Sequence, residues 1–270
     1  MLGVFGNIGM FSSRSYLACL LVCISSFWTF PASAQIVPDQ TLGTESSIFS
    51  SEIEIRGELA DLVEGGAIRG NNLFHSFSDF NIDELQRVYF ANPADVTSIL
   101  SRVTGNHTSN IFGTLGVNGN ADLFLLNPNG IIFGPDASLD IEGSFYATTA
   151  EAVELGNGVF NAADPEQSQL LAVRPSVSFF NHLTPQSGDI TNRGQIIAGG
   201  DLVLAGRNLD IEAQIGTVGD ISLLAADGIR MRDTAENPLI LLTGGDLLIQ
   251  GNQQINIVAL SHPDSELFSY

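Results

Sequence analysis

The segment GDLVLAGRNLDIEAQIGTVGDISLL, residues 200–224, decides the fold because it contains two copies of one short sequence pattern, here called the Gly-Asp phrase. In each copy, Gly-Asp is followed by an apolar residue, one residue of any kind and a second apolar residue. Gly-Asp pairs recur along this part of the chain, at Asp189, Asp201, Asp220 and Asp246. Asp201 and Asp220 are 19 residues apart, and a step near 20 residues is typical of one coil of a solenoid.

Apolar residues alternate within each phrase, which indicates short strands that turn one face inward. The alternating pairs are Leu202 and Leu204, Ile221 and Leu223, and Leu247 and Ile249. The longer step of 26 residues from Asp220 to Asp246 is expected to hold an insertion such as DTAENP, residues 233–238. We predict a parallel β-helix. A β-sandwich is the alternative, although its successive strands have no need to resemble one another.

Composition agrees with an all-β protein and argues against nucleic-acid binding. Charged residues make up 15% of the chain, below the roughly 25% of average globular proteins, and there are 28 glycines. Lysine is absent, so ten arginines face 30 acidic residues and the net charge is −20. Such a surface repels phosphate backbones and anionic lipid headgroups, so we expect no nucleic-acid partner.

The first 34 residues have the features of a secretory signal peptide. Residues 16–30 form a 15-residue apolar run, and PASA precedes an expected cleavage between Ala34 and Gln35. An uncleaved anchor helix is the alternative, but the run is shorter than the roughly 20 residues that span a bilayer. Because Cys19 and Cys23 lie in this leader, the mature chain would have no cysteine for disulfides, thiolate metal sites or catalysis.

The part of the chain after the leader is less regular, as expected for a cap over the open end of a solenoid. Phe74, Phe77 and Phe80 are interpreted as packing residues of this cap, and His75 as a hydrogen-bonded structural residue. Further on, LFLLNPNGIIFG, residues 123–134, joins two apolar runs through a turn. Proline presets φ in such a turn, and asparagine or glycine tolerates a positive φ after it.

Several phrases in fixed order resemble one known family. They are NNLFHSFSDF, VYFANP, SRVTG and SNIFGTLGVNGNADLFLLNPNGIIFGPDASLDIEGSFYATTA. The resemblance is to the amino-terminal secretion domain of two-partner secretion exoproteins, the filamentous haemagglutinin-type or haemagglutination activity domain. It runs from about Gln35 to Leu183.

The resemblance implies a right-handed parallel β-helix with an N-terminal cap and extra-helical strands. It implies export to the periplasm by the general secretion pathway, with cleavage by signal peptidase. An outer-membrane β-barrel transporter with polypeptide-transport-associated domains would then carry the chain to the medium or the cell surface. We therefore divide the chain into a signal peptide (1–34), a secretion domain (35–183) and continuing β-helix repeats (184–270). No cofactor, metal or catalytic residue is implied.

The resemblance also assigns a secretion motif. It comprises Asn127, Pro128, Asn129, Gly130 and Ile131, with Asn92 and Pro93 as a weaker counterpart of the family's second asparagine-proline element. That second element departs from the NPNL form, and Asp122 stands where relatives often carry asparagine. The motif has two interpretations: a structural corner that lets the first coils form, which we favour, or a surface that contacts the transporter.

The sequence has two alternative functional interpretations. An adhesin would bind a cell-surface glycan or matrix along the flank of the β-helix, and is the second hypothesis. A polysaccharide-acting enzyme is remote, because it needs clustered carboxylates, whereas the acids here lie largely at glycine-flanked corners. His75, His107, His182 and His262 share no metal-ligand spacing. The sequence is compatible with a short exoprotein, a truncated product or a piece of a longer protein.

Overall fold

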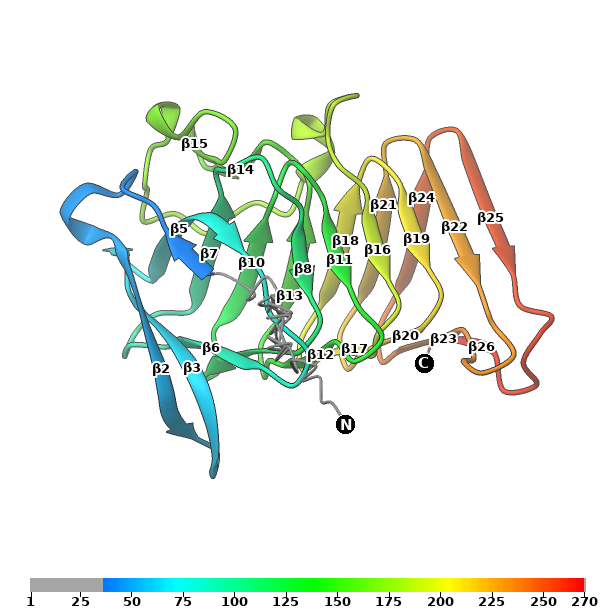
Figure 1. The fold of residues 1–270 in the computed structure, drawn as a ribbon. Helices are drawn as coiled ribbons and strands as arrows, with labels where there is room; N and C mark the ends of the chain where they lie inside the picture. The colour runs from blue at the N-terminus through cyan, green and yellow to red at the C-terminus, as the bar shows by residue number, and fades with distance from the viewer. Residues whose placement is uncertain (1–35, 270) are drawn as a thin grey trace, which may run out of the picture. The chain divides into compact units, whose positions relative to one another are not determined.

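Parallel strands stacked in three faces form the core of the structure, which is a computed structural model (Figure 1). The structure describes residues 36–269, which belong to one compact unit. The predicted signal peptide and its cleavage at Ala34 and Gln35 lie outside the described residues. No helix within residues 36–269 is long and apolar enough to cross a membrane.

The first face is a nine-stranded sheet in which every pairing from β5 onward is parallel. Antiparallel strands cover the outer edge of β5 at the N-terminal end, and this protects the edge from pairing with other chains. Its strands are β1 (Ile36–Pro38), β4 (Ala67–Arg69), β5 (Asn72–Phe80), β7 (Ser98–Val103), β10 (Asp122–Leu126), β13 (Phe145–Thr148), β18 (Leu202–Gly206), β21 (Ile221–Ala225) and β24 (Leu247–Gly251).

The other two faces complete each coil. The second face contains β8 (Ser109–Ile111), β11 (Ile131–Phe133), β16 (Ile190–Asn192), β19 (Leu209–Ile211), β22 (Gly228–Arg232) and β25 (Gln254–Val258). The third contains β2 (Ser47–Ile55), β3 (Glu58–Gly65), β6 (Arg87–Ala91), β9 (Thr114–Asn118) and β12 (Ser138–Asp140), then β17 (Ile196–Ala198), β20 (Gln214–Thr217), β23 (Ile240–Thr243) and β26 (Glu266–Ser269). A bridge between Ser138 and Gln195 joins the two parts of this face.

This topology confirms the parallel β-helix and excludes the sandwich. One coil runs through β18, β19 and β20 before β21 stacks on β18, so the 19-residue step is one turn of the solenoid. The segment 233–238 lies between β22 and β23, where it lengthens the next step to 26 residues as predicted. The alternating residues Leu202, Leu204, Ile221 and Leu223 are buried in the interior core.

A row of side chains along one corner explains the Gly-Asp phrase. Each side chain accepts a hydrogen bond from a backbone N–H of the next coil. The bonds are Ser144 N to Asp122 Oδ1 (2.8 Å), Asp201 N to Ser144 Oγ (2.9 Å), Asp220 N to Asp201 Oδ1 (3.0 Å) and Asp246 N to Asp220 Oδ1 (2.8 Å). The glycine leaves room for the carboxylate beneath it, because a Cβ on Gly245 would lie 2.1 Å from Asp220 Oδ1.

Asp189 does not belong to this row, although its Gly-Asp pair looked equivalent in the sequence. It precedes β16 on the second face, and its carboxylate accepts hydrogen bonds from Arg207 Nε (2.9 Å) and Asn208 Nδ2 (3.0 Å). A Gly-Asp pair therefore marks a corner of the β-helix without specifying which corner.

The phenylalanines of β5 point in two directions. Phe77 and Phe80 close the interior at the N-terminal end, where ring centroids lie 5.1 Å apart, and Phe80 stacks on Phe90 at 5.8 Å. Phe74 faces outward and meets the ring edge of Phe160 at 5.0 Å. The cap interpretation therefore fits Phe77 and Phe80, whereas Phe74 belongs to a second apolar layer.

That second layer lies beneath an extra-helical segment inserted between β13 and β16. The segment carries the antiparallel hairpin of β14 (Ala152–Leu155) and β15 (Gly158–Asn161) and the short 3-10 helices η2 (Pro165–Gln167) and η3 (Phe179–His182). It covers the outer side of the first face, where Phe124 and Tyr146 stack with centroids 4.3 Å apart. The predicted extra-helical strands are thus present, and a further 3-10 helix, η1 (Gly43–Glu45), follows β1.

We expect Gly245→Ala to lower the free energy of unfolding by about 1–3 kcal/mol, because the added methyl group overlaps the Asp220 carboxylate. Asp220→Ala removes the overlapping atoms, so the double variant should lose less than the sum of the two single losses. Urea denaturation of the four proteins measures this, and strictly additive losses would contradict the proposed close packing.

His75 should make the protein sensitive to mild acid. Burial lowers the pKa of His75 from 6.5 to about 3, and its Nδ1 lies 2.9 Å from Ser47 Oγ. The folded protein keeps the ring neutral while the unfolded chain binds a proton, so this stability is present above about pH 6.5 and is lost as the pH falls toward 3. Between pH 7 and pH 5 we expect a loss of about 2 kcal/mol.

The matched variant for this test is His75→Gln, which has no titratable group. Its free energy of unfolding, measured in urea at the same two pH values, should change much less than that of the native protein. An equal loss in both proteins would show that His75 is not the source of the acid sensitivity.

Candidate functional site: the Asn-Pro-Asn-Gly corner

The Asn-Pro-Asn-Gly motif forms a tight turn between β10 on the first face and β11 on the second. Gly130 N donates to Asn127 O at 3.1 Å, which closes the turn. Gly130 has a φ of 118°, in a region that side chains other than hydrogen rarely allow. Ile131 follows at once and is fully buried in the interior core. The local sequence therefore explains why the chain changes face here.

The side chain of Asn127 is the centre of this corner. It is fully buried, and its amide is satisfied at both ends. Nδ2 donates to His107 O (3.0 Å) and to Ser109 Oγ (2.9 Å), both in the preceding coil. Oδ1 accepts from Asn129 N (2.9 Å) and Asn129 Nδ2 (3.3 Å). One side chain thus shapes its own turn and ties it to the coil before it.

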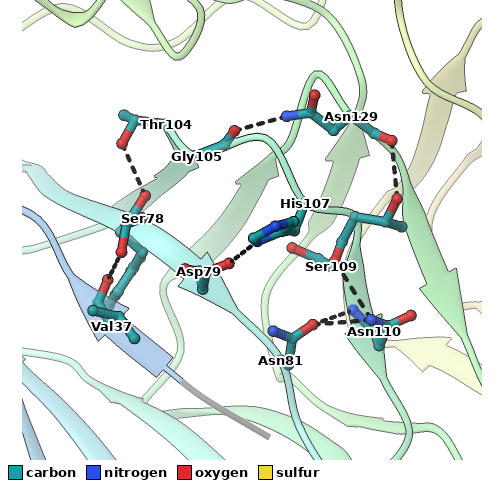
Figure 2. Close-up of polar contacts among 12 residues, drawn as sticks. Val37, Ser78, Asp79, Asn81, Thr104, Gly105, His107, Ser109, Asn110 and Asn129 are labelled. Atoms are coloured by element: carbon teal, nitrogen blue, oxygen red, sulfur yellow. Dashed lines mark hydrogen bonds and ion pairs between the residues drawn. The ribbon is translucent and has the colours of Figure 1, made fainter.

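Asn129 and Pro128 occupy the outer side of the same turn. Asn129 is exposed, and its Nδ2 donates to Gly105 O at 2.8 Å, a contact drawn in Figure 2. Thr108 Oγ1 donates to Asn129 O at 3.1 Å. Pro128 is half-buried, and its carbonyl accepts a hydrogen bond from Gly188 N at 2.7 Å. Among the motif's side chains, Asn129 is therefore the one presented most openly to solvent.

The following coil packs tightly onto the corner. A Cβ on Gly188 would lie 2.3 Å from Gly130 N, so only glycine fits there. β11 pairs with β8 before it and with β16 after it, through Ile131 opposite Ser109 and Ile190. The motif is therefore a junction of three successive coils, built from residues 105–109, 127–131 and 188–190.

The weaker motif, Asn92-Pro93, lies on a different corner, after β6 on the third face. Asn92 Oδ1 accepts hydrogen bonds from Asn120 N and Ala121 N, both at 3.1 Å. Its Nδ2 donates to Val96 O at 2.9 Å. The structure does not bring Asn92 and Asn127 together, but each holds the backbone of a neighbouring coil. Asp122 acts in the same way, since its carboxylate accepts from Ser144 N.

Sequence reasoning missed a second polar centre, formed by Arg102 and Asp39. Arg102 lies in the SRVTG phrase, in strand β7, where all six residues are buried. Burial lowers the pKa of Arg102 to about 10, although the nearby Asp39 opposes this shift. Burial also acts to raise the pKa of Asp39, but hydrogen bonds from Thr104, Thr41 and Ser76 bring it below its ordinary value. The available signal was an arginine in a short strand whose other residues are serine or aliphatic.

The structure also bears on the enzyme hypothesis. Two carboxylates lie between two arginines on the second face. Asp210, in β19, has its Oδ2 2.8 Å from Arg193 Nη2. Glu212, directly after β19, has its Oε1 2.5 Å from Arg230 Nη2. Burial alone would raise the pKa of Asp210, but hydrogen bonds from Arg230 and Arg193 lower it. Such a carboxylate stays ionised and is a poor general acid. Within residues 36–269, no three or more His, Cys, Asp or Glu side chains are grouped so that they could hold a metal ion.

Comparison with known proteins agrees with this architecture. A capped parallel β-helix with an Asn-Pro-Asn-Gly corner is the arrangement that the sequence resemblance implied for a secretion domain. A family model described as the TPS secretion domain, where TPS stands for two-partner secretion, matches residues 34–267. The chain belongs to this family of secretion domains, whose exoproteins are secreted across the outer membrane.

Two similar proteins show how much of each chain the similarity covers. The heme/hemopexin-binding protein of Haemophilus influenzae is 27% identical over 180 residues, which cover 63% of this chain and 18% of that protein. The chain thus matches less than a fifth of that relative's length. The crystal structure of the filamentous hemagglutinin secretion domain is 14% identical, with a TM-score of 0.40, and the match covers 82% of this chain and 96% of that one.

We expect the two asparagines of the motif to differ in their effect on stability. Asn127→Ala removes four hydrogen bonds in a buried site and should lower the free energy of unfolding by roughly 3 kcal/mol. Asn129→Ala removes an exposed bond to Gly105 O and the long bond to Asn127 Oδ1, which keeps Asn129 N as a donor, and should cost about 1 kcal/mol. Urea denaturation measures both. Equal losses would contradict the central role assigned to Asn127.

Proposed function

We propose that this chain directs its own secretion by folding, and that the Asn-Pro-Asn-Gly corner serves export because it lets the first coils form. The observation that carries the proposal is the complete burial of Asn127, whose amide joins its own turn to the preceding coil. A buried amide in the folded domain has no surface to offer a transporter. The favoured interpretation of the motif is therefore the structural one.

The partner in this proposal is an outer-membrane β-barrel transporter with periplasmic polypeptide-transport-associated domains. It would receive the chain from the general secretion pathway, after signal peptidase has cleaved between Ala34 and Gln35. Once outside, the chain buries the apolar residues of its coils, and this burial favours the exported side. The product would be a secreted or surface-bound β-helix that needs no cofactor and catalyses no reaction.

We assign recognition to residues 35–183 and treat residues 184–270 as further coils. The division lies directly after η3 (Phe179–His182), the last helical turn of the extra-helical segment. It places both asparagine-proline elements and the cap in the recognised part. The later coils would then extend the folded rod that the first part begins.

The test is a secretion assay in cells that express the chain with its transporter, comparing culture medium with periplasm. We expect Asn127→Ala to accumulate in the periplasm while the native protein reaches the medium. Asn129→Ala, with its smaller loss of stability, should be secreted at close to the native level.

A core variant separates folding from contact. Leu115→Ala lies in β9, in the coil that precedes the motif, and the side chain it truncates is fully buried. A buried leucine truncated to alanine loses about 2–5 kcal/mol, similar to the loss expected for Asn127→Ala. If secretion depends on folding, both variants are retained in proportion to their measured stability. Normal secretion of Leu115→Ala beside retention of Asn127→Ala would overturn the proposal in favour of direct contact.

A further inference from the structure

Arg102 makes four hydrogen bonds although it is a buried cation. It is 1% exposed and points outward from β7, beneath the segments that cover the first face. Nε donates to Ser76 Oγ (2.9 Å), Nη2 donates to Thr41 Oγ1 (2.8 Å), and Nη1 donates to Asn161 O (2.6 Å) and Ser168 Oγ (2.5 Å). The guanidinium also lies over the ring of Phe160, 4.5 Å from its centroid.

The carboxylate of Asp39 supplies a negative charge near this guanidinium, and the two groups are joined only through hydrogen-bonding hydroxyl groups. Thr41 Oγ1 donates to Asp39 Oδ1 (2.6 Å) and Ser76 Oγ donates to Asp39 Oδ2 (2.8 Å). Each hydroxyl therefore donates to the carboxylate and accepts from the guanidinium. Thr104 Oγ1 adds a further bond to Asp39 Oδ2 at 2.6 Å. Cation and anion are thus joined through two hydroxyl groups.

The partners of Arg102 come from separate parts of the chain. Asp39 and Thr41 follow β1 at the N-terminus, whereas Asn161 and Ser168 belong to the extra-helical segment. We propose that Arg102 couples the docking of these two segments, so that the N-terminal segment (residues 36–45) locks onto the β-helix only when the extra-helical segment (residues 150–187) is also in place.

The physical basis is the cost of a buried cation. A guanidinium removed from water needs acceptors for its N–H groups, and loss of one partner of a buried charged group is strongly destabilising. Each segment covers part of Arg102 and supplies only part of its acceptors. The second segment supplies the rest, so each docking step favours the other, and the coupling is reciprocal.

If the chain is exported as proposed above, this coupling sets the order in which the two segments dock during folding. Residues 36–45 directly follow the predicted signal peptide. Their docking onto the β-helix nevertheless requires Ser168, which lies more than a hundred residues later in the chain. The N-terminal segment would therefore stay undocked until the extra-helical segment has left the transporter.

Hydrogen exchange of the purified full chain, read by mass spectrometry, tests the coupling without any secretion. Ser168→Ala removes one acceptor on the extra-helical side, and should speed amide exchange in residues 36–45 by about fivefold or more. Thr41→Val removes an acceptor on the N-terminal side, and should speed exchange in residues 152–168 similarly. Glu166→Gln, in the exposed helix η2 beside Ser168, is the control and should leave residues 36–45 unchanged.

The reciprocal pattern is the decisive result. If Ser168→Ala speeds exchange only around residue 168, and Thr41→Val only around residue 41, the two segments dock independently and the proposal is wrong. Arg102→Met adds a second measure, because Ser168→Ala should have no further effect on residues 36–45 in that background. A coupling that is absent in purified protein refutes this inference alone, whereas the secretion assay decides the proposed function.

Discussion

The structure depends on hydrogen bonds from the backbone at one corner of a coil to a side chain of a neighbouring coil. Parallel strands satisfy one another along the β-helix, but N–H groups at the corners have no strand partner, and buried N–H groups need one. Asparagine, aspartate and serine supply the missing acceptors. Asp233 shows the principle inside the 26-residue step from Asp220 to Asp246, where its carboxylate accepts from Leu260 N, Ser261 N and His262 N. Each coil is thus fixed to its neighbours at the bends as well as along the strands.

Asn127 links two coils in the opposite sense: it is wholly buried, its Nδ2 donates to His107 O of the preceding coil, and its Oδ1 accepts from Asn129 N of its own turn. Its corner lies early in the chain, before the regular coils that begin at β16. Because each repeat of a solenoid contacts only its neighbours, formation of later coils relies on a finished coil to stack upon. In the proposed function, the role of the motif in export follows from this place in the fold. Arg102 adds a second constraint in the same region, since it ties both covering segments to the first face.

Much of the fold could be predicted from the sequence, because the repeat depends on residues that lie close together in the chain. The Gly-Asp phrase, the inward alternation of Leu202 and Leu204, and the insertion at 233–238 depend on spacing alone, and the structure has them as predicted. The corner that Asp189 occupies was not predictable, because a Gly-Asp pair does not reveal which corner it forms. The environment of Arg102 was not predictable, since its acceptors at Thr41 and Ser168 are distant in the chain. For the motif, the turn was predicted, but the burial of Asn127 and its bond to His107 needed the structure.

The central claim is that the Asn-Pro-Asn-Gly corner organises the first coils, on which the later ones build. Pulse-labelled hydrogen exchange during refolding of the purified chain tests it most directly, because it records when each coil acquires protected amides. We expect amides in residues 105–131 to become protected before those in residues 202–258. Earlier protection of residues 202–258 would contradict it, and would place the start of folding in the C-terminal coils.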